Sequence, residues 1–241
     1  QSSYVKITPE GELAYYPDKQ GNTIPDFSRV GYHHGDKSIP DYPVTKTVYP
    51  VEKGDSRQRI QDAIDEVSRM KPDKNGYRGT VLLKRGVYHV HGTIHINTGG
   101  VILTGEGDNV NETRLLAIGK QRFSLIEVSG NGRMEEVSGT RVKITDAFVP
   151  VGTHSFQVSS ATNFKVGDRI IVYRPGTENW IHDIKMDQIV ERQGTRQWTA
   201  REYNLSFERE IVKVEGNRIY IDNPVVMQME EKYGGGEVFK Y

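Results

Sequence analysis

A stretch of short apolar runs separated by glycines, residues 79–132, constrains the fold more than any other part of the chain. The runs are rich in β-branched residues and too short for helices, so each indicates a strand. They lie at 81–83, 87–88, 94–96, 101–103, 115–116 and 125–126. No helical pattern lies between them, although parallel strands of one sheet normally need helical crossovers. The pattern therefore leaves a sandwich, a barrel or a β-solenoid.

A single amphipathic helix is predicted at residues 55–70, immediately before these strands. Asp55 or Ser56 can cap its first turn. Its apolar face consists of Ile60, Ala63, Ile64, Val67 and Met70. A solenoid has an apolar cross-section at each end, which a terminal cap must cover. The position of the helix therefore favours a β-solenoid.

The segments around this helix share a further pattern. They read IPDFSRVGY at 24–32, IQDAID at 60–65, GYRGTVLL at 76–83, GVY at 86–88 and GVILTGEG at 100–107. Through these segments, residues 24–139 resemble the N-terminal portion of the pectate-lyase superfamily. The resemblance implies an all-β chain that forms the N-terminal coils of a right-handed parallel β-helix, with an N-terminal α-helical cap.

The same resemblance implies a polysaccharide as partner, because members of this superfamily mostly cut or bind polysaccharides. It leaves the reaction open, since lyases, hydrolases, epimerases and phage tailspikes share the N-terminal pattern. The catalytic residues of the family usually lie on later coils, which have no counterpart here. Catalytic residues are therefore unknown and expected outside this chain. No cofactor is evident in the sequence, and calcium is implied only through the resemblance.

Composition excludes several classes of protein. Hydrophobic residues make up 35% of the chain and the mean hydropathy is −0.62, which suits the thin core of a solenoid. The formal net charge is zero, so no basic surface indicates nucleic acid and no charge surplus indicates a membrane surface. No apolar run approaches the ~20 residues of a membrane span. The absence of cysteine excludes disulfides and thiolate metal sites.

Four segments are predicted along the chain. Residues 1–48 form a lead-in and cap loop, and 49–139 form the capping helix and first β-helix coils. Residues 140–236, with longer alternating strands, form an inserted antiparallel β-domain, and 237–241 return to the β-helix. The last coil would then expose strand edges without a neighbour. We therefore expect the remainder of the β-helix as a continuing or separate chain, with this chain as a fragment.

A long irregular arm, residues 175–207, is the predicted substrate-binding surface. Loops of this length in compact domains are usually functional or disordered, and both tryptophans of the chain lie here. Flat rings stack on sugar faces, and cations pair with uronate or sulfate groups. The candidate residues are Trp180, His182, Lys185, Trp198, Arg201 and Tyr203. An alternative interpretation is that the two tryptophans pin the arm onto the solenoid.

The histidines do not predict a metal site. His33 and His34 are adjacent, and neighbouring side chains of an extended chain point to opposite sides, so they rarely share one metal ion. His89, His91 and His95 alternate with apolar residues, but the turn expected at Gly92 breaks their register. Hydrogen bonding in the cap loop and a solvated surface explain these histidines equally well.

Function follows from the resemblance and from the arm. The chain is predicted to be the N-terminal part of an exported polysaccharide-degrading enzyme, secreted, periplasmic or at the cell surface. A lyase that acts on a uronate-containing polysaccharide by β-elimination is favoured. The alternatives are a glycoside hydrolase of the same fold and a non-catalytic carbohydrate-binding or structural β-helix module. Neither the base and cation of a lyase nor the carboxylate pair of a glycosidase is recognisable by spacing.

Overall fold

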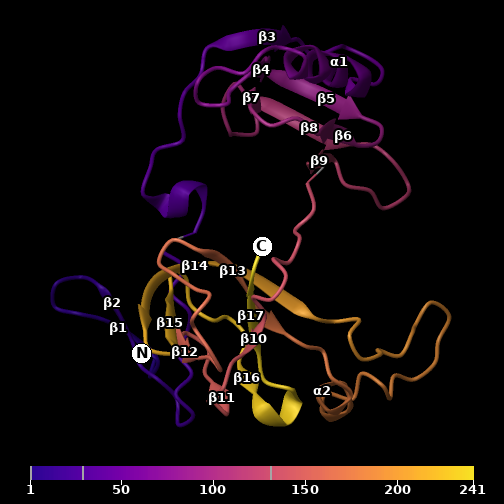
Figure 1. The fold of residues 1–241 in the computed structure, drawn as a ribbon. Helices are drawn as coiled ribbons and strands as arrows, with labels where there is room; N and C mark the ends of the chain where they lie inside the picture. The colour runs from indigo at the N-terminus through magenta and orange to yellow at the C-terminus, as the bar shows by residue number, and fades with distance from the viewer. Residues whose placement is uncertain (1, 29, 131) are drawn as a thin grey trace. The chain divides into compact units, whose positions relative to one another are not determined.

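The computed structural model describes residues 2–28, 30–130 and 132–241, and these are mostly β with two α-helices (Figure 1). Arg29 of the IPDFSRVGY segment lies outside the described residues, as do Gln1 and Asn131. The chain divides into two compact units. Unit 1 comprises Gln1–Ser38 and Met134–Tyr241, and unit 2 comprises Ile39–Arg133. Neither α-helix is long and apolar enough to cross a membrane.

Unit 2 consists of short strands in three parallel sheets, together with helix α1 (Figure 1). The sheets are β3-β4-β7, β5-β8 and β6-β9, and all their strand pairs are parallel. The strands are β3 (Val44–Val48), β4 (Gly79–Leu83), β5 (Gly86–Val90), β6 (Ile94–Ile96), β7 (Val101–Gly105), β8 (Thr113–Ala117) and β9 (Ile126–Val128). The glycine-punctuated runs are therefore strands, as predicted.

The order of these strands is what a solenoid requires. From β4 onward the chain visits the three sheets in turn and then visits them again in the same order. Each strand therefore pairs with the strand one circuit later, without a helix between them. The handedness of this path and a complete β-helix remain predictions.

Helix α1 (Arg57–Ser68) confirms the amphipathic pattern of the sequence. It buries Ile60, Ile64 and Val67 in the core of unit 2 and packs against β3, β4, β6 and β7. The Asp55 carboxylate accepts a hydrogen bond from the Arg57 N–H (2.8 Å), which satisfies a free donor of the first turn. The helix thus covers apolar side chains of the parallel strands, as a cap does.

Unit 1 is built on an antiparallel six-stranded sheet, in the order β10-β17-β13-β14-β15-β12. Its strands are β10 (Val142–Lys143), β12 (Ser155–Gln157), β13 (Arg169–Arg174), β14 (Leu205–Glu215), β15 (Arg218–Ile221) and β17 (Glu237–Lys240). The remaining elements are β1 (Val5–Ile7), β2 (Leu13–Tyr15), η1 (Tyr32–Gly35), β11 (Phe148–Val149), α2 (Glu178–Asp183), β16 (Met229–Glu230) and η2 (Glu231–Tyr233). β1 and β2 pair as an antiparallel hairpin, and so do β14 and β15.

The sheet curls until its two ends meet. Ile144, just after β10, forms an antiparallel bridge with Val158, just after β12. The Thr145 N–H donates to the Gln157 carbonyl oxygen (2.9 Å) beside this bridge. The inward residues of the curled sheet form one apolar core, in which Phe156, Ile170, Ile211, Ile219 and Val238 are fully buried. This closure protects strand edges that would otherwise be open to pairing with another chain.

Two of the predicted segment boundaries differ from the structure. Residues 237–240 do not return to the parallel strands but form β17, which pairs antiparallel with β13 and β10. Val238 is fully buried in the core of unit 1, so burial of this residue favours the antiparallel sheet. The predicted N-terminal segment is divided between the units: residues 1–38 belong to unit 1, where the Thr23 N–H donates to the Val151 carbonyl oxygen (2.9 Å), and residues 39–48 belong to unit 2.

Candidate functional site

The arm leaves the sheet after β13 and returns to it at β14, so paired strands hold both of its ends. Helix α2 forms its first part. The Thr177 side chain caps the helix by accepting a hydrogen bond from the Trp180 N–H (3.4 Å), and Ile181 is buried as an anchor. On the return, the Arg201 N–H donates to the Gly176 carbonyl oxygen (2.7 Å). The base of the arm is therefore tied down at both sides.

Three of the predicted site residues form one aromatic cluster at this base. The rings of Trp198 and Tyr203 are stacked, with centroids 3.7 Å apart and planes 16° apart. Trp180 lies tilted against Trp198, with centroids 6.1 Å apart. All three side chains are half-buried. Each stacked ring offers at most one face to a ligand, so the cluster both fixes the arm and presents aromatic surface.

Arg174 contacts the aromatic cluster through the Trp180 ring, and this residue was not predicted from the sequence. Its guanidinium carbon lies 4.5 Å from the centroid of the Trp180 ring, and its Nε donates to the Gln228 carbonyl oxygen (3.2 Å). Arg174 is only 3% exposed, and this burial lowers the pKa of its guanidinium. Its Nη1 has no hydrogen-bond partner among the described residues. The alternating pattern of β13 predicts which side of the strand Arg174 faces. It does not predict that an arginine is buried there.

Lys185 and Arg201, two further predicted residues, have left-handed backbone conformations, with φ of 60° and 67°. Lys185 follows the end of α2, where its N–H donates to the His182 carbonyl oxygen (2.9 Å) and the Met186 N–H donates to that of Ile181 (3.0 Å). This is a Schellman motif, which normally carries glycine at this position. A lysine here is a strained choice, and such strain is found mainly at functional sites.

We expect Lys185→Gly to stabilise unit 1. Glycine removes the Cβ strain of a left-handed residue, so the free energy of unfolding should rise by about 1 kcal/mol. Urea unfolding followed by tryptophan fluorescence measures this change, because both tryptophans lie in the arm. Lys185→Ala is the matched control that loses the charge and keeps the strain. Equal stability of the two variants would contradict the expectation.

His182 is exposed and pairs with an acidic neighbour on the arm. Its Nδ1 lies 2.9 Å from a carboxylate oxygen of Asp187. This hydrogen bond, together with the negative charge, raises the pKa of His182 above its ordinary 6.5. The same hydrogen bond lowers the pKa of Asp187 below its ordinary 3.8. The protonated imidazole is thus favoured at pH values where a free histidine has begun to lose its charge.

The pair should make the arm sensitive to pH. Because the pKa of His182 is raised on folding, its contribution is complete below pH 6.5 and is lost as the pH rises through the raised pKa. Because the pKa of Asp187 is lowered, its contribution is complete above pH 3.8 and is lost as the pH falls through the lowered pKa. Asp187→Asn should return the His182 pKa toward 6.5. An imidazole titration by NMR tests this, and an unchanged midpoint would refute the pairing.

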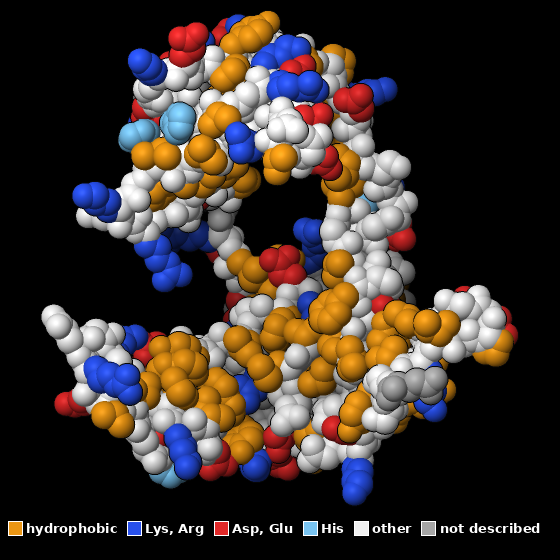
Figure 2. Space-filling view, turned by 180° about the vertical axis from the view of Figure 1, so that it is seen from behind, with side chains coloured by type: hydrophobic (Ala, Val, Ile, Leu, Met, Phe, Trp, Pro, Cys, Tyr) orange, Lys and Arg blue, Asp and Glu red, His pale blue; other side chains and the backbone are white. Residues whose placement is uncertain are grey.

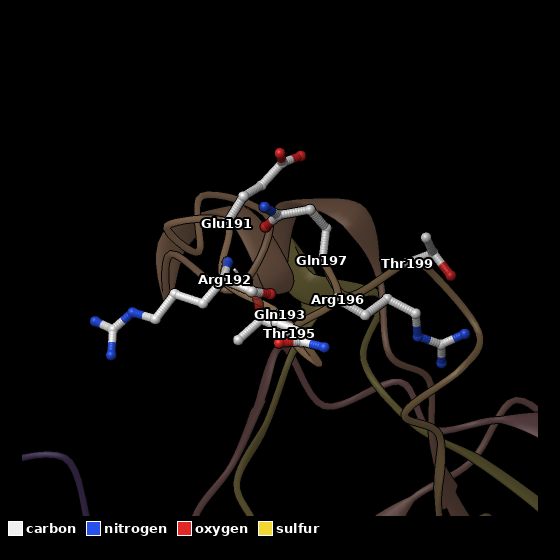
Figure 3. A pocket seen from close by; sticks show the side chains of 7 residues that line it. All are labelled: Glu191, Arg192, Gln193, Thr195, Arg196, Gln197 and Thr199. Carbon is white, nitrogen blue, oxygen red and sulfur yellow. Dashed lines mark hydrogen bonds between the residues drawn. The ribbon is translucent and has the colours of Figure 1, made fainter.

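The outer part of the arm encloses an open hollow of about 660 Å³ (Figure 3). It is lined by Glu191, Arg192, Gln193, Thr195, Arg196, Gln197 and Thr199. Several of these side chains are already engaged: Arg196 pairs with Glu202, and Gln197 binds the backbone of Ile189 through both ends of its amide. Figure 3 shows Arg192 and Arg196 extending in opposite directions. Arg192 forms no ion pair within the described part of the chain.

The structure therefore divides the six predicted residues into two groups. Trp180, Trp198 and Tyr203 contact one another, whereas the side chains of His182, Lys185 and Arg201 are exposed around them. Arg174 and Arg192 are additional cations of the arm region that the prediction missed. The composition of the arm already contained Arg192, but nothing in the sequence distinguished it from a solvated loop residue.

A metal ion does not fit the described residues. Within residues 2–28, 30–130 and 132–241, no group of three or more histidine, aspartate or glutamate side chains is arranged to hold one. Calcium takes six to eight oxygen ligands, usually with several carboxylates. The calcium ion that the family resemblance implies therefore has no donor set in this part of the chain.

Comparisons with known proteins give few matches. No family model matches the chain, and no curated protein matches it. The structure is similar to the Gp54 tailspike of Acinetobacter baumannii bacteriophage AP22, solved in complex with A. baumannii capsular saccharide. The TM-score is 0.33 at 11% identity, over 79% of this chain and 25% of that chain.

Two further tailspikes are similar to the same extent. The gp61 tailspike of Pseudomonas phage phi297 has a TM-score of 0.33 at 18% identity, and covers 76% of this chain and 24% of that chain. The gp49 tailspike of Pseudomonas phage LKA1 has a TM-score of 0.31 at 16% identity, with the same coverage. The chain thus spans about a quarter of the length of these tailspikes.

Proposed function

We propose that this chain is part of an exported polysaccharide-degrading protein and that its arm binds an acidic polysaccharide. One observation carries the proposal: a half-exposed aromatic cluster lies on the same arm as three cations that form no ion pair among the described residues. Those cations are Lys185, Arg192 and Arg201. Aromatic faces suit the C–H faces of sugar rings, and unpaired cations suit carboxylate or sulfate groups.

The charge pattern of the arm supports an acidic ligand. Its other basic groups are already neutralised, because His182 pairs with Asp187 and Arg196 pairs with Glu202. The unpaired cations are exposed and keep their charge available to a ligand. A flexible chain of acidic sugars can contact several of them at once, and the sum of such contacts gives affinity where each contact alone is weak.

The reaction that we favour is β-elimination by a lyase on a uronate-containing polysaccharide. That reaction requires a base that takes the proton next to the carboxylate and a cation that neutralises the carboxylate. We propose that both of these catalytic groups lie on further coils of the parallel β-helix, as the family resemblance implies. A lyase produces 4,5-unsaturated ends that absorb in the ultraviolet, whereas a hydrolase produces reducing ends without that absorbance.

Binding of polygalacturonate by the purified chain tests the proposal. Replacing Lys185, Arg192 and Arg201 together with glutamine should weaken binding by at least about tenfold, because each lost contact is worth ~0.5–1 kcal/mol. The salt dependence of binding should also become shallower. The control is a triple variant of Lys19, Lys143 and Lys165, which are basic residues of unit 1 outside the arm. An equal loss of polygalacturonate affinity in the two triple variants would show that only net charge matters, and it would contradict the proposal.

The aromatic cluster gives a second, independent variant. Trp198→Ala should weaken polygalacturonate binding more than it weakens folding, because the ring is half-buried and not part of the apolar core of unit 1. Binding is measured by calorimetry and stability by thermal unfolding. If stability collapses and binding follows the folded fraction, the tryptophans only pin the arm.

A further inference from the structure

A strained turn near the N-terminus of unit 1 lies outside the proposed arm site. His33 and His34, within η1, have left-handed backbone conformations with φ of 45° and 58°. Such conformations cost of order 1–3 kcal/mol each in residues other than glycine, and they persist where the surroundings determine them. Backbone strain of this kind is concentrated at ligand sites, so the hollows beside this turn are candidates for a binding site.

His34 lines two adjoining hollows of unit 1, of about 130 and 280 Å³. Arg209 and Asn223 also line both hollows, so the two hollows are neighbours. We name the two together the His34 groove, and its principal residues are Phe27, His34, Arg209, Glu210, Asp222 and Asn223. Figure 2 shows that unit 1 carries apolar and charged side chains side by side on its surface. The groove combines both kinds at one place.

Arg209 lines both hollows of the groove and has no carboxylate partner among the described residues. Its guanidinium donates to three backbone carbonyl oxygens, those of Glu208 (2.7 Å), Asn223 (3.0 Å) and Pro224 (2.7 Å). It forms no ion pair with any described residue, and burial lowers its pKa. Three of its five N–H groups are used, so two donors remain in a fixed, partly desolvated position.

The polar wall supplies acceptors. One Asp222 carboxylate oxygen accepts the Glu210 N–H (2.8 Å) and the other accepts the Asn223 side-chain amide (2.7 Å). Each carboxylate oxygen can accept a second hydrogen bond. The Glu210 side chain is exposed and makes no hydrogen bond or ion pair with a described residue. The carboxylate oxygens of Glu210 and Asp222 can therefore accept further hydrogen bonds. The two residues lie on β14 and just after β15, which are paired strands.

A second part of the lining is apolar. Phe27 is 59% exposed and Val30 is 60% exposed, which is unusual for large apolar side chains that line a hollow. Pro224 and Val226 lie along the same hollow. The lining of the groove thus combines an aromatic ring, carboxylate acceptors and guanidinium donors.

We propose that the His34 groove binds a neutral sugar residue. A pyranose has an apolar C–H face that fits against Phe27, and hydroxyl groups that both donate and accept hydrogen bonds. Those hydroxyls match a site with acceptor-only carboxylates at Glu210 and Asp222 and donor-only groups at Arg209. Few other small molecules carry an apolar face and this mixture of donors and acceptors together.

The charge of the groove selects against an acidic sugar. Three carboxylates line its polar part, those of Glu208, Glu210 and Asp222, against the two guanidinium groups of Arg169 and Arg209. A uronate carboxylate placed beside them would be repelled. The inference rests on the proposed function in one respect, that unit 1 contacts polysaccharide. It adds that the polysaccharide contains neutral residues beside the acidic ones that the arm binds.

The side-chain amide of Asn223 reports occupancy of the groove by NMR. We expect its signals to shift when the chain is titrated with galactobiose, cellobiose or xylobiose at millimolar concentrations, and to stay in place with digalacturonate. Phe27→Ala should weaken binding of the effective disaccharide about tenfold, because it removes the stacking wall. Glu210→Gln keeps the size of the side chain and should weaken it less.

The matched control is Val166→Ala, which changes an apolar side chain of similar exposure (62%) elsewhere in unit 1. It should leave disaccharide binding unchanged, and both variants should keep the thermal stability of the parent chain. The proposal would be overturned if none of the three neutral disaccharides shifted the NMR signals of the Asn223 side-chain amide. A Phe27→Ala variant that binds as tightly as the parent would also overturn it.

The two sites can fail separately. If neutral disaccharides shift the Asn223 signals while polygalacturonate does not bind, the arm proposal fails and the groove stands. If polygalacturonate binding depends on the arm cations while the Asn223 signals do not respond, the groove proposal fails and the arm stands.

Discussion

Replacing Phe156 with alanine should lower the free energy of unfolding of unit 1 by about 4 kcal/mol. Phe156 is 0% exposed, lies on β12 and pairs antiparallel with Ile219 of β15 in the middle of the apolar core. Its removal loses the transfer free energy of the ring and leaves a cavity that the curled sheet cannot fill by moving one strand alone. Since Val158, just after β12, bridges Ile144, just after β10, the loss affects the closure of the sheet.

Urea unfolding followed by tryptophan fluorescence measures this change, because Trp180 and Trp198 both belong to unit 1. Val212→Ala on β14 is the control, since that side chain is 51% exposed and should change stability by less than about 0.5 kcal/mol. A loss below about 1 kcal/mol for Phe156→Ala would contradict the position of this ring in the core.

Gly100→Ala should destabilise unit 2 by about 3 kcal/mol, through two separate effects. Gly100 has φ of +84°, a conformation that costs about 1–2 kcal/mol in alanine. A Cβ at this position would also collide with the backbone carbonyl of Gly76. Overpacking of this kind destabilises a protein by about 1–3 kcal/mol. The Gly100 carbonyl oxygen accepts the Arg78 N–H (2.7 Å) at the start of β4, so the strain would reach the parallel sheet.

The neighbouring glycine provides a control of the same type. A Cβ at Gly99 meets no atom within 4 Å, so Gly99→Ala should be nearly neutral. Hydrogen exchange of the β4 and β7 amides separates the two variants, because unit 2 contains no tryptophan. Similar exchange rates in the two variants would show that the turn does not require a left-handed glycine.

The sites fall on different parts of unit 1 for a common physical reason. The arm is long and hangs between two paired strands, so it can present cations and rings without disturbing the core. The His34 groove instead combines Arg209 and Glu210 of β14 with residues outside the sheet, such as Phe27 and Asn223. Binding residues on loops that a rigid scaffold positions are common in proteins. Unit 1 therefore carries both proposed contacts with polysaccharide.

The sequence by itself determined the local structure of this protein. The glycine-punctuated runs gave strands, and the apolar periodicity of residues 55–70 gave helix α1. These features depend on interactions between residues close in the chain, so a short window contains their physical cause. The aromatic cluster of the arm was predictable for a related reason, because its three rings lie within 24 residues of one segment.

Only the tertiary structure decided which distant segments lie together. Residues 237–240 could satisfy their alternating pattern in either sheet, and burial of Val238 in unit 1 decided the outcome. The His34 groove joins Phe27 and His34 to Arg209 and Asn223, about 180 residues later, and no local pattern connects them. The burial of Arg174 is equally non-local. Strand edges and apolar faces select partners by complementarity across the whole fold, which a one-dimensional pattern does not contain.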